Sequence, residues 1–125
     1  MKGYKPPKPP KLPPLPTQKE LEYLRVIADA IQMFRPIEFT YVTDDHAKWR
    51  AGFPCRVGEL NKGNLGLEAY NPNWTTDGGT RRQPHKLFLL KDMDNLRLGD
   101  GMFSSFEVIG YEHVSERFAR VEAEL

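Results

Sequence analysis

The sequence predicts a small α+β fold in which one amphipathic helix precedes a mostly antiparallel β-barrel of the SH3/Sm-like kind. Apolar residues recur at helical spacing over residues 18–34, and their spacing then changes to two in short segments separated by glycine and proline. Short, bent, antiparallel strands close most readily into a small barrel. At 125 residues the chain holds one such core. We therefore divide it into an extended arm, residues 1–16, and one domain, residues 17–125.

The arm is rich in proline and lysine and contains no acid. Its lysines are spaced by three, at Lys2, Lys5, Lys8 and Lys11. Polyproline II has three residues per turn and rises about 3.1 Å per residue, so this period aligns the four ammonium groups on one edge, about 9 Å apart. An uncharged run similar to the peptides that SH3 domains bind follows at Leu12, Pro13, Pro14, Leu15 and Pro16. The arm is a candidate for docking to a protein partner, for lying along a phosphate backbone, or for a solubilising tail.

Charge is divided unevenly between the arm and the domain. The whole chain has a formal charge of +1, but residues 17–125 carry 14 basic and 17 acidic residues, a net charge of −3. A general nucleic-acid binder is more often basic throughout. Any contact with a polyanion is therefore expected to be local, on the arm or on one patch of the domain.

The predicted helix has clear start and stop signals. Thr17 followed three residues later by Glu20 is a capping box, and Pro36 disfavours helical backbone at Arg35. The apolar positions between these signals, which we expect to face the core, are Leu21, Leu24, Ile27, Ala28, Ile31, Met33 and Phe34. The pattern predicts a helix over residues 18–34.

The rest of the domain is predicted to be mainly strands. Strands are expected at 37–42, 48–53, 55–60, Leu65–Tyr70, 86–90 and 96–98, and a further one is possible at 103–109. Gly52 and Pro54 mark a bend between the second and third of these strands. Apolar residues spaced by four, three and four, beginning at Val114, predict a helix over residues 114–125.

A long segment, residues 71–85, carries the best candidate for ligand binding, because loops of this length in small domains are usually functional or disordered. Arginine forks beside an aromatic ring are what single-stranded nucleic acid requires for its phosphates and bases. The candidates are Trp74, Arg81, Arg82 and Lys86, with Arg50 and Arg56 on strands expected nearby. The alternative is a solvated loop whose arginines pair with Glu38, Glu68 or acids near the C-terminus.

The sequence does not predict an enzyme, a metal site or a cofactor. Its three histidines, His46, His85 and His113, lack metal-ligand spacing, and Asp44 and Asp45 are typical of a turn. The single cysteine, Cys55, is expected to be buried and excludes an internal disulfide, which favours a reducing cytoplasmic location. We expect no membrane span, because no apolar run approaches the roughly 18 residues required.

The order of the segments FRPIEFTY, GNLGLEAYNP and HKLFLL resembles the WYL domain over about residues 21–98. The positions that match the family's pattern are Tyr41, Leu67, Ala69, Tyr70, Lys86 and Phe88. The tripeptide that names the family would fall at Leu65, Gly66 and Leu67, and Asp92 stands where the family has a basic residue. The resemblance implies an SH3/Sm-like barrel in a stand-alone, divergent member. It also implies that Tyr41 and Tyr70 belong to a site for nucleotides or single-stranded nucleic acid, with a regulatory role.

Two functions follow from these observations. The first is a non-enzymatic module that binds single-stranded nucleic acid or a nucleotide through the basic and aromatic residues above. The second is an interaction or assembly protein that docks on a larger complex through its proline-rich arm.

Overall fold

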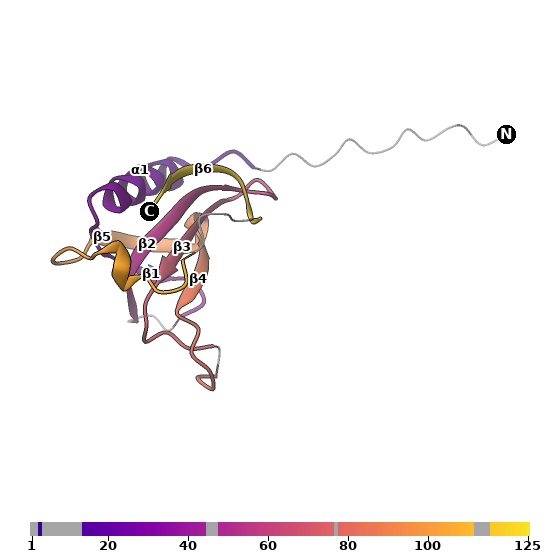
Figure 1. The fold of residues 1–125 in the computed structure, drawn as a ribbon. Coiled ribbons are helices and arrows are strands. Elements are labelled where there is room, and N and C mark those ends of the chain that lie inside the picture. Colours follow the sequence, from indigo (N-terminus) through magenta and orange to yellow (C-terminus); the bar gives the residue numbers. More distant parts are fainter. Residues whose placement is uncertain (1–2, 4–13, 45–47, 77, 112–115) are drawn as a thin grey trace.

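The computed structural model describes residues 3, 14–44, 48–76, 78–111 and 116–125. In these residues one helix packs on a sheet of six strands (Figure 1). The elements are α1 (Gln18–Gln32), β1 (Ile37–Tyr41), β2 (Trp49–Leu60), β3 (Leu65–Tyr70), β4 (His85–Leu89), β5 (Met93–Leu98) and β6 (Phe118–Glu124). Two short 3₁₀ turns, η1 (Leu90–Asp92) and η2 (Ser105–Glu107), lie in the connections.

The capping box predicted for the helix is confirmed. The Thr17 hydroxyl accepts the backbone N–H of Glu20 at 3.2 Å, and the Glu20 carboxylate accepts the backbone N–H of Thr17 at 2.6 Å. These contacts satisfy two N–H groups that would otherwise lack partners at the helix start. Ile27 and Ile31 are buried against the sheet, as their spacing predicts, and Ala30 is buried beside them. The prediction that Leu21 faces the core is wrong, because Leu21 is 51% exposed.

The helix ends earlier than predicted, and the two residues after it are therefore partly exposed and not in the core. We expected Met33 and Phe34 in the core, but they are 47% and 38% exposed. Helix α1 ends at Gln32, and Phe34 has a φ of 54°, in the left-handed region that ends many helices. Because Phe34 no longer follows the helical period, its side chain does not reach the buried face of α1.

The sheet is antiparallel and open, with strand order β4-β3-β2-β1-β5 and β6 paired with β2. Strand β2 is the organising strand, because its first part pairs with β1 and its second part pairs with both β3 and β6. We predicted two strands divided near Gly52 and Pro54, and the structure has one strand whose pairing shifts register between Pro54 and Arg56. This bulge reverses which residues of β2 face α1.

Each face of the sheet has its own apolar cluster. Helix α1 covers a cluster that includes Phe39, Val57, Leu67 and Phe88. On the opposite face, Phe103 and Val108 of the segment 99–111 pack against Cys55 and Tyr70 in a second cluster. Cys55 is buried as predicted, and burial raises the pKa of its thiol to about 12. Among the described residues, no helix is long and apolar enough to cross a membrane.

The prediction of a C-terminal helix over residues 114–125 is wrong, because Phe118–Glu124 form strand β6. Its pairing with β2 contains two register shifts, so buried and exposed residues do not alternate along it. The sequence signal for this strand lies in β2, at Gly58. A Cβ there would stand 2.2 Å from the Arg120 carbonyl oxygen, so only glycine lets β6 approach. The possible strand at 103–109 is also absent, because the chain forms η2 there.

Candidate nucleic-acid interface

The segment predicted as a long loop is a hairpin that extends beyond β3 and β4 (Figure 1). Its two sides are joined by backbone hydrogen bonds, among them Gln83 N–H to the Trp74 carbonyl at 2.8 Å, and by an isolated bridge between Thr75 and Arg82. Gly78 and Gly79 have φ values of 88° and 72°, which the turn at the tip requires. The hairpin therefore has a defined arrangement, and its tip lies beyond the sheet.

Arg81 and Arg82 lie on the returning side of this hairpin, and both are exposed. Arg82 donates to the Pro72 carbonyl oxygen at 3.2 Å, which ties its guanidinium to the other side of the hairpin. Within the described part of the chain, neither arginine forms an ion pair. The alternative prediction of a solvated segment fits their exposure, but its pairings do not occur among the described residues. Glu38 pairs with Arg97, and Glu68 and the C-terminal Glu124 pair with Arg56.

Trp74 stands at the base of the hairpin and connects it to the core. Its ring lies edge-on to Phe88, with ring centroids 5.4 Å apart, and it is half-buried. It also closes over Gly52, where a Cβ would meet the ring at 2.8 Å. Because Trp74 is half-buried in this packing, the indole offers a base only its exposed part.

Arg50 joins Trp74 at this end of the sheet. Its guanidinium carbon lies 5.8 Å from the Trp74 ring centroid and 5.1 Å from that of Phe88. It forms a bidentate ion pair with Asp44, at 2.6 and 2.8 Å, and this hydrogen bonding lowers the pKa of the Asp44 carboxyl. Because Asp44 already compensates the charge of Arg50, the main role of Arg50 here is to hold Asp44 near the Trp74 and Phe88 rings.

Lys86 and Tyr41 lie beside this group. Lys86 is on β4, on the same face as Phe88, and its positive charge also lowers the pKa of Asp44. The Tyr41 hydroxyl accepts the Leu89 backbone N–H at 3.0 Å, and burial is the main cause of its raised pKa. Tyr41 thus joins β1 to β4, two strands that are not neighbours in the sheet order.

Two of the predicted residues, Arg56 and Tyr70, lie on the opposite face of the sheet. Arg56 is 1% exposed and pairs with Glu68 at 2.9 Å and Glu124 at 3.0 Å. It also donates to the Tyr111 hydroxyl at 3.1 Å. Tyr70 is 4% exposed and packs in the cluster with Cys55. Neither side chain meets Arg81, Arg82 or Lys86, so the site loses two of its eight predicted members.

The structure places only part of the remaining sequence-predicted groups. The arm residues Lys2, Lys5, Lys8, Lys11, Leu12 and Pro13, and also His46 and His113, lie outside the described residues. Pro14, Leu15 and Pro16 are exposed, and Leu15 is 90% exposed. His85 packs on Tyr70, with ring centroids 4.8 Å apart, and its Nε2 hydrogen-bonds the Ile109 carbonyl at 2.6 Å.

Two participants were missed in the sequence. Asp44, interpreted as a turn residue, is the ion-pair partner of Arg50. Phe88, assigned to the core, is the ring against which the Arg50 guanidinium lies. The predicted strands at 37–42 and 48–53 contained the signal for the first, because a short connection between two antiparallel strands keeps Asp44 close to the start of the second strand.

Comparison with family models, with curated proteins and with solved structures finds no match for this chain. The resemblance to the WYL domain stays a prediction.

Proposed function

We propose that this protein is a non-enzymatic module that binds single-stranded nucleic acid or a nucleotide at the protruding hairpin. The observation that carries the proposal is the exposure of Arg81 and Arg82 on an ordered hairpin, without an ion-pair partner among the described residues. Guanidinium groups that are not neutralised by the protein are available to phosphate oxygens as bidentate donors.

The surroundings of the arginines support the same chemistry. Lys86 on β4 adds a third cation, and Trp74, at the base of the hairpin, is partly exposed. Each base of a single strand has a face that stacks on an aromatic ring, whatever its sequence. The module therefore binds phosphates through the hairpin and one base at Trp74, with little sequence preference.

The proposal includes a curled sheet of the SH3/Sm type, as the WYL resemblance implies. Its support is the contact between β1 and β4, where the Phe39 and Phe88 ring centroids are 5.0 Å apart and Tyr41 accepts from Leu89. These contacts bring together two strands that would close a barrel. Because Arg50 is held by its ion pair with Asp44, its role in this curled sheet is structural and not ligand binding.

The experiment is a binding titration with short, fluorescently labelled single-stranded DNA and RNA. The double variant Arg81→Glu/Arg82→Glu is expected to abolish binding, because it replaces two phosphate donors with like charges. The matched control is Arg25→Glu/Lys62→Glu, which makes the same charge change at two exposed residues, on α1 and at the β2–β3 turn. Equal affinity of the hairpin variant and wild type would remove the hairpin from consideration, and equal loss in both variants would show only a general charge effect.

A second candidate function, protein interaction, is favoured by the segment between β5 and β6. Phe106 is 94% exposed, although Ser104 and Glu107 form a capping box that orders the turn around it. Met102 and Ile109 in the same segment are 73% and 72% exposed. Large apolar side chains presented in this way are typical of protein-binding surfaces. Phe106→Ser is expected to abolish co-purification of the protein partner. The control is Val42→Ser, at a residue 67% exposed, which is expected to retain the partner.

A further inference from the structure

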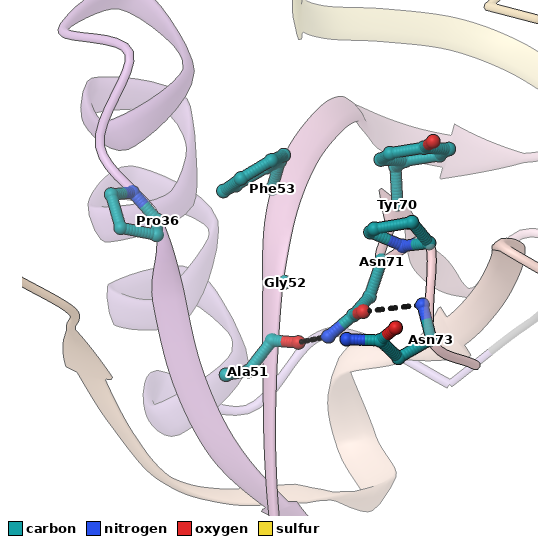
Figure 2. Close-up of a pocket in the computed structure, with 8 residues that line it drawn as sticks. Pro36, Ala51, Gly52, Phe53, Tyr70, Asn71 and Asn73 are labelled. Atoms are coloured by element: carbon teal, nitrogen blue, oxygen red, sulfur yellow. Dashed lines mark hydrogen bonds between the residues drawn. The ribbon is translucent and has the colours of Figure 1, made fainter. Parts of the chain in front are cut away.

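An open pocket lies where the chain leaves β3 for the hairpin (Figure 2), and one of its lining residues, Pro72, accepts a hydrogen bond from Arg82 at 3.2 Å. The pocket has a volume of about 280 Å³. Its walls come from the start of β1, the middle of β2 and the chain after β3, and the lining residues are Pro36, Ala51, Gly52, Phe53, Tyr70, Asn71, Pro72 and Asn73. None of these residues is an aspartate, glutamate, lysine, arginine or histidine.

The pocket is lined by rings and its walls are fixed. Phe53 stacks on Tyr70, with centroids 6.4 Å apart, and on Phe103, at 4.5 Å. Asn71 braces the opposite wall, because its amide nitrogen donates to the Ala51 carbonyl at 2.7 Å and its amide oxygen accepts the Asn73 backbone N–H at 2.8 Å (Figure 2). Tyr70 is 4% exposed and supports the partly exposed Phe53 from below. The result is a preformed surface formed by the Phe53 ring and two proline rings, with amide groups at its edge.

Surfaces of this composition suit polyproline II segments. Such a segment is rigid before it binds, so it loses little conformational entropy, and its proline rings pack between aromatic rings. This chain carries one uncharged segment of that kind, residues 12–16. Its described end is unpartnered, since Leu15 is 90% exposed despite being apolar. We propose that the pocket binds residues 12–16 of a second copy of this chain.

The segment must come from a second copy because its own cannot reach. The arm joins the N-terminus of α1, whereas Pro36 lies just beyond the C-terminus of that helix. A helix of 15 residues is about 22 Å long. Five residues of polyproline II span about 16 Å. If the arm folded back along α1, residues 12–16 would therefore end before the pocket, and only the lysine-bearing part of the arm would come near these uncharged walls.

The contact is reciprocal, because each copy inserts its residues 12–16 into the pocket of the other. Two equivalent contacts related by a two-fold axis reinforce each other, since the second forms within an already joined pair. The inference does not rest on nucleic-acid binding, although Arg82 donates to the carbonyl of the pocket residue Pro72. The contact between two copies is therefore expected in protein that is free of nucleic acid.

The test uses full-length protein in a mixture of two preparations. One is isotope-labelled wild type; the other is unlabelled and carries a nitroxide on a cysteine introduced by Lys11→Cys, while the buried Cys55 stays unmodified. The backbone amide signals of Gly52, Asn71 and Asn73 are expected to broaden, because the spin label of one copy lies beside the pocket of the other. A nitroxide at Lys62→Cys, on the exposed β2–β3 turn, is the control and leaves them sharp.

Two variants check the same contact by sedimentation. Leu12→Ser/Leu15→Ser removes the apolar side chains of the segment at positions outside α1, and Ala51→Gln extends an uncharged side chain into the pocket. Each is expected to convert dimer to monomer, whereas Ala51→Ser stays dimeric. Sharp pocket signals in the mixture, or broadening only when spin label and isotope are in the same chain, would overturn the proposal.

Discussion

Replacing Arg56 with methionine is expected to destabilise the domain strongly, because it leaves two carboxylates without their shared cation. The Arg56 side chain is 2% exposed, while those of Glu68 and Glu124 are 21% and 36% exposed. Removing one partner of a buried ion pair costs about 3–5 kcal/mol. Because both carboxylates retain contact with water, we expect the low end of that range, about 3 kcal/mol.

The assay is urea unfolding followed by tryptophan fluorescence. With a slope of about 2 kcal/mol per molar, the loss lowers the midpoint by about 1.5 M urea. The matched control is Arg97→Met. Its ion pair with Glu38 is exposed, with Arg97 at 58%, so the expected loss is below about 1 kcal/mol. Equal, small losses in the two variants would refute the view that Arg56 holds β6 and the segment containing Tyr111 to the sheet.

Three other predictions concern single positions. Gly58→Ala places a Cβ 2.2 Å from the Arg120 carbonyl, so it should separate β6 from β2 and accelerate hydrogen exchange of the β6 amides; unchanged exchange would contradict this packing. The hydrogen bond from Arg50 lowers the pKa of Asp44, so the pair stabilises the fold above the carboxyl's ordinary value of 3.8 and loses this effect as pH falls through the lowered value. Asp44→Asn should therefore flatten the acid limb of a plot of unfolding free energy against pH, and an unaltered limb would exclude the contribution. Burial raises the pKa of Cys55 to about 12, so an alkylating reagent at pH 8 should modify it only in urea, not in the native protein.

The elements that could be predicted are those with local signals. The capping box fixes the start of α1, and turn residues on both sides of a period-two segment fix β3 at Leu65–Tyr70, the range the sequence predicts. Strand β6 has no such signal, since register shifts remove the alternation on which the interpretation of strands depends. Its position is decided by a glycine in another strand.

The candidate site was predicted only in part, because a register shift in β2 also changes which of the predicted residues share one face of the sheet. Arg50 and Arg56 are six residues apart, so an unbroken strand would place them on one face. The bulge between Pro54 and Arg56 adds a residue and reverses this parity, which sends Arg56 to the buried network on the other face. A proline inside a strand indicates a bulge but not how it changes the register. The exposed Arg81 and Arg82 depend on no such parity, because they lie beyond the sheet.

The salt dependence of single-strand binding tests most directly whether the hairpin arginines contact phosphates. On a plot of the logarithm of affinity against that of salt concentration, each contact contributes about 0.7 to the slope. Replacing Arg81 and Arg82 with glutamine, which adds no repulsion, should lower the slope by about 1.4 relative to wild type. A weaker affinity with the wild-type slope would contradict the account, because the two residues would then act without touching the phosphates.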